Sequence, residues 1–351
     1  MNGCCVPYLA LALYLSTPDQ TEIARHVQEA RSSIRTGRVD FEFRVYKVSA
    51  GVASEVNAGS YHCAFENDQL RCDLKHGQEV RRTLLTDGEL YTHIAEPGRN
   101  FATALRIDHK LSVGELEKNR QAVMLDPRVV GMYVVSALQL HAMRASKLSI
   151  APNPDTKFQI AEDDVEGVYC WRVDIEWQNS GTQETYWISP DMGYNVVRGT
   201  ARYGLKDGRK FVDSIDCKLR EYGKDKIWYP ETVSFRREVN GEPVMRDEII
   251  TKDASFNEPL DVKAEFSIAG FDLPPDSGVY EQPANPTGAV RWDGEKLAPY
   301  HLGDRRKNLS AAVAHSNRWR QVIGLSAGAL GAALFALYAW RRKNLKTGLL
   351  G

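Results

Sequence analysis

The sequence lacks the residue patterns from which enzyme activity is usually inferred. Its eight histidines never occur at H-x-x-x-H or H-E-x-x-H spacing, and it has no glycine-rich phosphate loop and no cysteine motif suited to redox chemistry. Nothing in residues 1–300 pairs a nucleophile with a base. We therefore expect no catalytic residue, no cofactor and no metal site, and we interpret the scattered histidines as surface or core residues.

Most of the chain also lacks the excess of positive charge that nucleic-acid binding requires. The net charge is −1 over all 351 residues, while the residues after position 300 carry nine Lys or Arg and one acid, a net of +8. Residues 1–300 therefore carry −9. This acidic body argues against a nucleic-acid partner, and the basic residues instead flank an apolar run, where anionic lipid headgroups would attract them.

Only one apolar run in the chain is long enough to cross a bilayer. VIGLSAGALGAALFALYAW, from Val322 to Trp340, has 19 residues and no charge. As a helix it would be about 28 Å long, close to the ~30 Å hydrocarbon core of a bilayer. We predict a transmembrane helix over 322–340, with Trp319, Tyr338 and Trp340 at the membrane interfaces.

The letters GLSAG within this run fit two motifs. Gly324 to Gly328 reads as G-x-S-x-G, the nucleophile elbow of serine hydrolases, and as G-x-x-x-G, a packing face of membrane helices. An elbow needs an acid and a histidine to complete its triad, and neither residue type follows Ser326. We favour the membrane interpretation, in which Gly324 and Gly328 lie on one strip of small residues.

The N-terminus predicts export. Cys4 to Leu15 form an apolar run of 12 residues, which is too short to span a bilayer and similar to a signal-peptide core, although no Lys or Arg precedes it. A buried first helix or a misplaced start codon is the alternative. Five Lys or Arg before the predicted span and four after it leave orientation to the signal peptide.

We therefore expect a single-pass inner-membrane protein with its main domain in the periplasm and its C-terminus in the cytoplasm. The expected parts are a signal peptide at 1–16, a β-rich extracytoplasmic domain at 17–280, a juxtamembrane linker at 281–321, the transmembrane helix at 322–340 and a short basic cytoplasmic tail at 341–351.

The cysteine spacing predicts a disulfide within a hairpin. A two-residue loop at Asn67-Asp68 pairs residues whose numbers sum to 135, and Cys63 and Cys72 meet this condition. They fall at a non-hydrogen-bonded position, where Cα atoms are about 4.5 Å apart, near the short end of the disulfide range. A zinc site from His62, Cys63, Cys72 and His76 is disfavoured, because neighbouring residues of a strand point to opposite faces.

The rest of the body is mainly β. Ile23, Val27, Ala30 and Ile34 are spaced as on one face of a helix, with Thr17 or Asp19 as its cap and Gly37 as its stop. Alternating runs and turn signals then predict consecutive hairpins, which form one long antiparallel meander. A sheet of that length must curl, and helices must cover one of its faces.

A mid-chain insertion supplies the second predicted cover. The run SVGELEKNRQAVML predicts a helix, and DPRVVGMYVVSALQLHAMR predicts a stronger one, capped by Asp126 and extending from Pro127 to Arg144. In that helix Val134, Leu138 and Met143 would face the concave side of the sheet.

Several short phrases, together with this order of elements, resemble a known group. They are Trp187-Ile188-Ser189-Pro190-Asp191-Met192-Gly193-Tyr194, Trp228-Tyr229-Pro230-Glu231 and GFDLPPDSGV from Gly270 to Val279. Over about residues 17–280 the chain resembles the LolA-like lipoprotein-carrier superfamily, including anti-sigma-factor regulators of the RseB type. The resemblance implies a half-barrel of antiparallel strands, covered by helices, around a hydrophobic cavity that takes acyl chains. The predicted C-terminal span departs from the soluble carriers and puts transport between membranes in doubt.

Two classes of function remain open from the sequence. One is a membrane-anchored extracytoplasmic domain that binds a lipid or the acyl chain of a lipoprotein, with Val134, Leu138 and Met143 as ligand-binding residues. The other is a single-pass sensor or protein-interaction module of the envelope with no enzymatic activity. A cavity too large for packing to fill would favour the first, and a filled core would favour the second.

The small-residue strip of the predicted span permits either a homodimer or a monomeric anchor. Replacing Gly324 or Gly328 by Ile puts a bulky side chain where two helix backbones would meet. If the strip is a packing face, each variant should lose self-association in a membrane association assay. A monomeric wild type that both substitutions leave unchanged would identify the span as an anchor only.

Overall fold

The computed structural model describes residues 17–87, 89–95, 105–108, 125–137, 139, 150, 153–273, 277–282 and 290–299. The described residues divide into two units, the first of residues 17–282 with Trp292–Lys296 and the second of residues 290–291 with 297–299. The predicted signal peptide and transmembrane helix lie outside the described residues. Among the helices that are described, none has the length and apolar character needed to cross a membrane.

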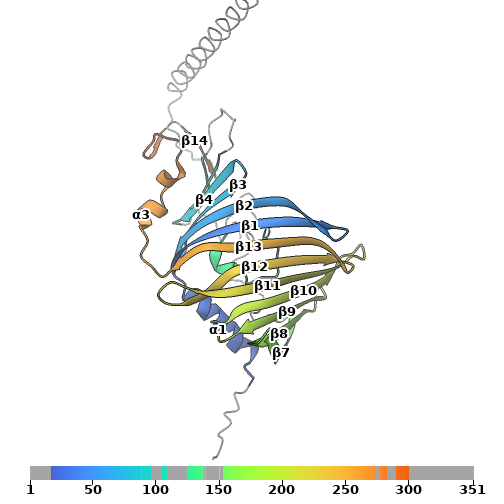
Figure 1. Ribbon diagram of the computed structural model, residues 1–351. Coiled ribbons are helices and arrows are strands. Elements are labelled where there is room, and N and C mark those ends of the chain that lie inside the picture. The colour runs from blue at the N-terminus through green and yellow to red at the C-terminus, as the bar shows by residue number, and fades with distance from the viewer. Residues whose placement is uncertain are drawn as a thin grey trace, which may run out of the picture. The chain divides into compact units, whose positions relative to one another are not determined.

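The first unit is a curved sheet built from two runs of hairpins (Figure 1). The first run contains β1 (Thr36–Ser49), β2 (Val52–Glu66), β3 (Gln69–His76), β4 (Glu79–Thr86), β5 (Glu89–Ala95) and β6 (Leu105–Asp108). The second contains β7 (Thr156–Val165), β8 (Val168–Trp177), β9 (Thr182–Ser189), β10 (Asn195–Gly204), β11 (Lys210–Tyr222), β12 (Ile227–Val239) and β13 (Glu242–Phe256). β14 (Ser277–Gln282) follows, and β15 (Val290–Trp292) and β16 (Leu297–Pro299) are short.

The two runs are joined at the middle of the sheet by β1 and β13. Val39 of β1 lies opposite Cys63 of β2 on one side and Ala254 of β13 on the other. The strand order within the first unit is therefore β14-β6-β5-β4-β3-β2-β1-β13-β12-β11-β10-β9-β8-β7. The predicted hairpins are confirmed, but the single meander is wrong, because β1 is central rather than an edge strand. β14 pairs with β6 in a parallel orientation. The other neighbouring strands in this order pair in antiparallel orientation, as β5 does with β6.

Turn residues and bulges explain how the strands reverse and curve. Asp87, Gly208, Asn240 and Gly241 have positive φ, and each lies in a turn between two paired strands. Bulges interrupt the register of β1 against both of its neighbours, and another lies between β11 and β12 beside Pro230, which has no N–H to donate. Bulges bend a strand and increase its twist, so they curve the sheet.

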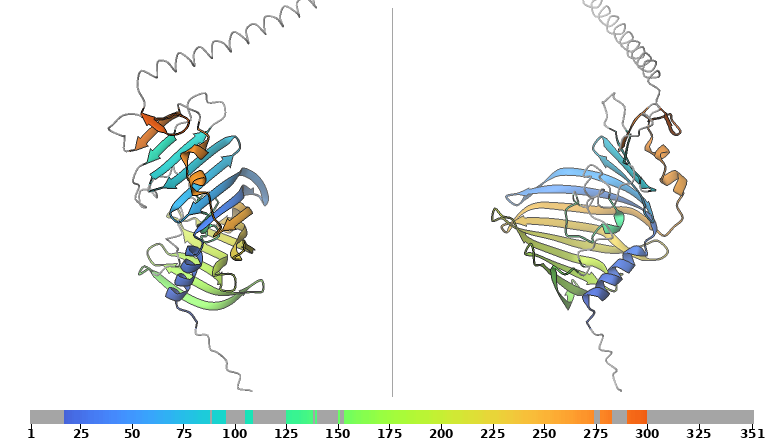
Figure 2. Two further views of the ribbon diagram at one scale, coloured as in Figure 1. Left: turned by 90° about the vertical axis from the view of Figure 1, so that its left-hand side faces the viewer. Right: turned by 180° about the vertical axis from the view of Figure 1, so that it is seen from behind.

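Helix α1 (Gln20–Ser32) covers one face of this sheet, which we call the inner face (Figure 2). Asp19 caps the helix by accepting a hydrogen bond from the Glu22 N–H at 2.8 Å, as predicted. Ile23 and Val27 are buried on the sheet side. The predicted stop at Gly37 is wrong: the helix ends at Ser32, and Gly37 lies in β1, where an added Cβ would be 2.8 Å from Phe65.

The second cover of the inner face is residues 125–137, which we call the cover segment. We predicted an α-helix from Pro127 to Arg144, and over the described residues this is wrong: only a single 3-10 turn forms, η1 (Pro127–Val129). Every residue from 125 to 134 except Arg128 is buried, whereas a helix on the surface of a sheet buries only one side. The segment therefore follows an irregular path that buries all of its sides. Gly131, with φ at +76°, also turns the backbone out of the helical region.

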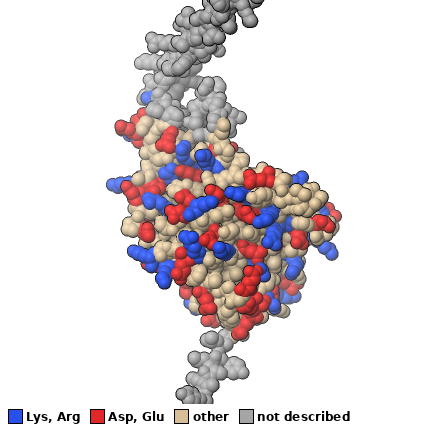
Figure 3. Space-filling view, viewed as in Figure 1, with Lys and Arg blue, Asp and Glu red and all other residues tan. Residues whose placement is uncertain are grey.

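The opposite, outer face is polar and faces the viewer in Figure 3, where Lys and Arg are interspersed with Asp and Glu. His62 lies there, with its Nδ1 2.5 Å from a carboxylate oxygen of Asp40. Beside β3 to β6, the short helices α3 (Val262–Glu265) and η3 (Ile268–Phe271) cover this face, and Arg71 donates to the Gly270 carbonyl at 2.8 Å. His62 and Cys63 thus point to opposite sides of the sheet, as the alternation predicted.

Cys63 and Cys72 pair directly across β2 and β3, which confirms the predicted register. The predicted disulfide is not present in the structure. Both cysteines are free thiols, with their Sγ atoms 3.5 Å apart. Both side chains are fully buried, and burial raises the pKa of the Cys63 thiol well above its ordinary value. A buried thiol that stays protonated is a poor nucleophile, which opposes oxidation of this pair.

Gly131 should be far less tolerant of alanine than a glycine of the same φ elsewhere. A Cβ at Gly131 would lie 2.9 Å from Pro230 Cγ and 3.2 Å from Cys217 Sγ. At Gly51, with φ at +77°, a Cβ would meet nothing within 4 Å. We expect Gly51→Ala to lower the free energy of unfolding by about 1 kcal/mol through backbone strain, and Gly131→Ala by a further ~1–3 kcal/mol through overpacking. Urea denaturation measures both values, and equal losses would mean that the cover segment does not press on the sheet.

Candidate functional site

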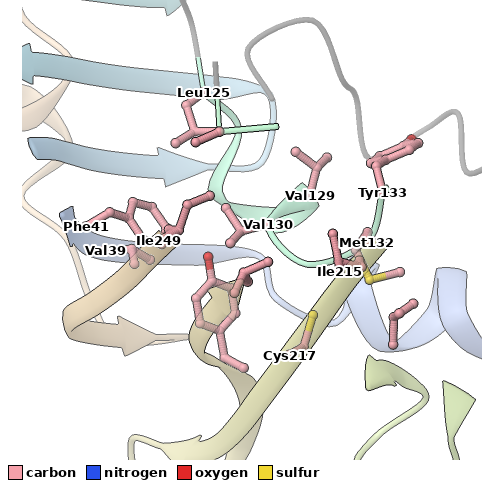
Figure 4. Close-up of a cluster of buried hydrophobic side chains, with 14 of the residues drawn as sticks. Val39, Phe41, Leu125, Val129, Val130, Met132, Tyr133, Ile215, Cys217 and Ile249 are labelled. Carbon is pink, nitrogen blue, oxygen red and sulfur yellow. The ribbon is translucent and has the colours of Figure 1, made fainter. Parts of the chain in front are cut away.

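The inner face under the cover segment is the candidate site, because it is continuous, apolar and covered by a segment that is not part of the sheet. Figure 4 shows Leu125, Val129, Val130 and Met132 of the cover segment beside side chains of the central strands. The strand residues that form this part of the core are Val39, Phe41, Ile215, Cys217, Tyr229, Val233, Phe235 and Ile249.

The cover segment is attached to the inner face through side chains. Tyr229 donates its hydroxyl to the Pro127 carbonyl at 2.7 Å, and the thiol of Cys217 contacts the Gly131 carbonyl at 3.6 Å. The Cys63 thiol is 3.7 Å from the Leu125 carbonyl. Within the described part of the chain, the backbone bonds of the cover segment are local, such as Met132 N–H to Val129 C=O. The segment therefore adds no strand to the sheet.

Val134 is the one predicted ligand-binding residue that the structure describes. It is buried, and its Cγ2 would be 2.7 Å from a Cβ added to Gly199 of β10. Glycine at position 199 thus lets the cover segment approach the strand closely, beside Ile215 and Tyr186. Val134 faces the inner side of the sheet as predicted. Leu138 and Met143 lie outside the described residues, and the role of all three in binding stays a prediction.

A buried polar cluster holds the far end of the cover segment. Arg237 makes two hydrogen bonds of 2.7 Å to Asp213, and the Ala137 N–H donates to Asp247 Oδ2 at 2.9 Å. Burial raises the pKa of Asp247 to about 6, against the lowering effect of the Ala137 N–H and Arg237 and with a further rise from Asp213. One carboxylate of this pair is therefore only partly neutralised by Arg237.

Arg31, at the end of α1, is the functional candidate that the sequence reasoning missed. It is only 3% exposed and lies between the helix, the cover segment and β10. Its Nη2 donates to Asn195 Oδ1 at 2.5 Å and its Nε to the Met132 sulfur at 3.1 Å. A signal was present: Arg31 continues the buried i, i+4, i+8 stripe that Ile23 and Val27 begin.

The phrases that carried the family resemblance build the surroundings of Arg31. Tyr194 stacks on His26 of α1 with ring centroids 4.4 Å apart. Asn195 donates its amide group to the Met192 and Trp228 carbonyls at 2.6 and 3.2 Å, which directs its oxygen toward Arg31. The guanidinium also lies 5.9 Å from the ring centroid of Tyr229. Both phrases therefore help to dock α1 on the inner face.

Comparison with known proteins gives likeness in structure alone, since no family model and no curated protein matches the chain. A domain described as an outer membrane lipoprotein-sorting protein from Vibrio parahaemolyticus is 10% identical, with a TM-score of 0.42 over 70% of this chain and 94% of that one. A DUF1329 family protein from Desulfovibrio piger is also 10% identical, with a TM-score of 0.43 over 72% and 99%. A LolA superfamily protein from Nitrosomonas europaea, again 10% identical, has a TM-score of 0.38 over 70% and 97%. Membership of this chain in that superfamily stays a prediction.

The raised pKa of Asp247 predicts how stability changes with pH. Its contribution is fully present below its ordinary pKa of 3.8 and is lost as the pH rises through about 6. Asp247→Asn stays neutral and keeps an oxygen to accept the Ala137 N–H. The variant should therefore gain stability over the wild type as the pH rises, by up to about 3 kcal/mol at neutral pH.

Urea denaturation at a series of pH values measures this difference. Asp253→Asn is the control, because Asp253 is exposed on the same strand. A gap between Asp247→Asn and wild type that does not grow with pH would show that Asp247 is not held as a costly buried carboxylate.

Proposed function

We propose that this protein is a membrane-anchored, extracytoplasmic binding protein for a hydrophobic ligand, a lipid or a lipoprotein acyl chain. The ligand occupies the inner face of the sheet in the space that the cover segment fills in the structure. The domain acts by binding and has no enzymatic activity. Its location rests on the predicted signal peptide and span at 1–16 and 322–340.

The observation that carries this proposal is the way in which the cover segment is held. It packs on the inner face through apolar side chains and through the hydroxyl, thiol and carboxylate contacts of Tyr229, Cys217 and Asp247. It can leave without breaking a β-ladder, and its departure uncovers a continuous apolar surface on the central strands. That surface is the kind that binds an acyl chain.

The energetics favour a long-chain ligand. Six buried apolar side chains of the cover segment, at about 1.5–3 kcal/mol each, hold it with about 10 kcal/mol or more. An acyl chain returns about 0.8 kcal/mol per buried CH₂, so only a chain of a dozen or more carbons can replace the segment. The residues in question are Leu125, Val129, Val130, Met132, Tyr133 and Val134.

A second candidate function is a sensor or protein-interaction module without a ligand. The filled inner face favours it, because the described cover segment leaves its own part of that face packed. In that case the cover segment is a permanent core element, and the polar outer face would meet a partner.

Locking the cover segment to the sheet separates the two functions. Val134→Cys and Gly199→Cys together place two thiols at the close contact between the segment and β10. We expect the purified full-length wild type to retain co-purified lipid in native mass spectrometry and to bind hexadecanoic acid far more tightly than octanoic acid. The double variant should lose both properties when oxidised and regain them with reductant.

The reduced double variant is the matched control, because it carries the same two substitutions without the cross-link, and Val134→Cys alone should show no difference between its two redox states. Retention of lipid by the oxidised double variant would contradict the displacement of the cover segment. Failure of the wild type to bind any chain would instead support the interaction module.

A further inference from the structure

Among the described residues, the buried guanidinium of Arg31 has no negative partner within ion-pair distance. Its Nη1 is buried and makes no hydrogen bond, and among the described residues no carboxylate forms an ion pair with it. Asp126 is one carboxylate whose field acts on it, but Arg128 holds Asp126 with bonds of 2.9 and 3.0 Å. Arginine does not give up its proton in proteins, so the positive charge persists.

A buried guanidinium without an anionic partner lowers the stability of the fold, and a bound anion would offset this loss. Removing a charge from water is unfavourable even after the protein relaxes, and a neutral amide offsets only part of this free energy. The acceptor on Nε is the thioether sulfur of Met132, which is a weak one. Met132 also belongs to the cover segment, so this acceptor departs when the segment moves.

The position of Arg31 connects it to both solvent and the inner face. A pocket of about 220 Å³ is lined by Arg31 and by the charged residues Asp225 and Lys226 of the turn before β12, whose charges offset each other. The other lining residues are Ala30, Ser33, Ile34, Gly193, Asn195, Ile227 and Trp228. Its cation–π partner Tyr229 belongs to the apolar core of the inner face. The residue therefore stands where the polar end of an amphiphile would lie if its chain occupied the inner face.

We propose that Arg31 binds the negatively charged group, a carboxylate or phosphate, of an amphiphile whose apolar chain lies on the inner face. This rests on the proposed function. Nη1 and Nε donate to the anion, Nη2 stays on Asn195, and Asp247 at the other end of the cover segment disfavours the reverse orientation of the ligand.

Pairs of ligands that differ only in charge test the assignment. Equilibrium dialysis of the purified full-length protein would compare hexadecanoic acid and hexadecyl phosphate with hexadecan-1-ol. The wild type should prefer the anionic forms by about tenfold or more, the scale of charge-assisted hydrogen bonds. Arg31→Met should lose this preference and still bind hexadecan-1-ol.

Two variants guard against a trivial loss of folding. Arg25→Met removes an exposed arginine of the same helix, which pairs with Glu29, and should keep the wild-type preference. Arg31→Met without ligand should unfold at the same temperature as wild type or higher, because it removes an unpaired buried charge. Should that variant not fold, Arg31→Lys keeps the charge and should retain a weaker preference.

The outcomes distinguish this inference from the function on which it rests. Equal binding of charged and neutral chains, unchanged in Arg31→Met, overturns the anion site and leaves acyl binding intact. Binding of no chain at all overturns the proposed function. Inorganic phosphate tests whether a free anion binds instead. If phosphate alone stabilises the wild type and the protein shows no preference among the three chains, Arg31 binds a free anion and not the head of an amphiphile.

Discussion

The pairing of β1 with β13 is the constraint on which the rest of this structure depends. It joins residues about two hundred positions apart and turns two runs of hairpins into one sheet with one inner face. Without it each run would have its own edge and its own apolar surface to cover. With it, α1 and the cover segment pack on the central strands of both runs.

Among the described residues, the inner face combines an apolar centre with two buried and incompletely paired charged groups at its margins. Arg31 stands beside α1, and Asp247 stands where the cover segment ends. Neither has a full ion-pair partner among the described residues, and both contact the cover segment. Buried groups of this kind lower stability, and natural proteins tend to keep them at sites of function. The apolar contacts of the cover segment stabilise the fold, but in the proposed function the same segment must be displaced for a ligand to bind.

The contrast between the two covers of the inner face is physical. Helix α1 satisfies its own backbone and presents one stripe, so its packing requires little of its neighbours. The cover segment is buried on nearly all sides and relies on side chains of the sheet, such as Tyr229, for its carbonyls. A ligand that replaced it would have to offer the sheet an equivalent apolar surface.

The sequence alone determined the features that depend on residues close together in the chain. Alternation and turn residues located most strands, and the loop at Asn67-Asp68 placed Cys63 opposite Cys72. The pattern is weaker in β7, where consecutive acidic residues interrupt the alternation. The central place of β1, the irregular path of residues 127–137 and the isolation of Arg31 were decided by tertiary structure. Each depends on contacts between distant residues, as between Arg31 and Asn195, 164 positions apart. The periodicity of hydrophobic residues along a short segment cannot predict such contacts. They arise only when distant segments pack together in the folded core.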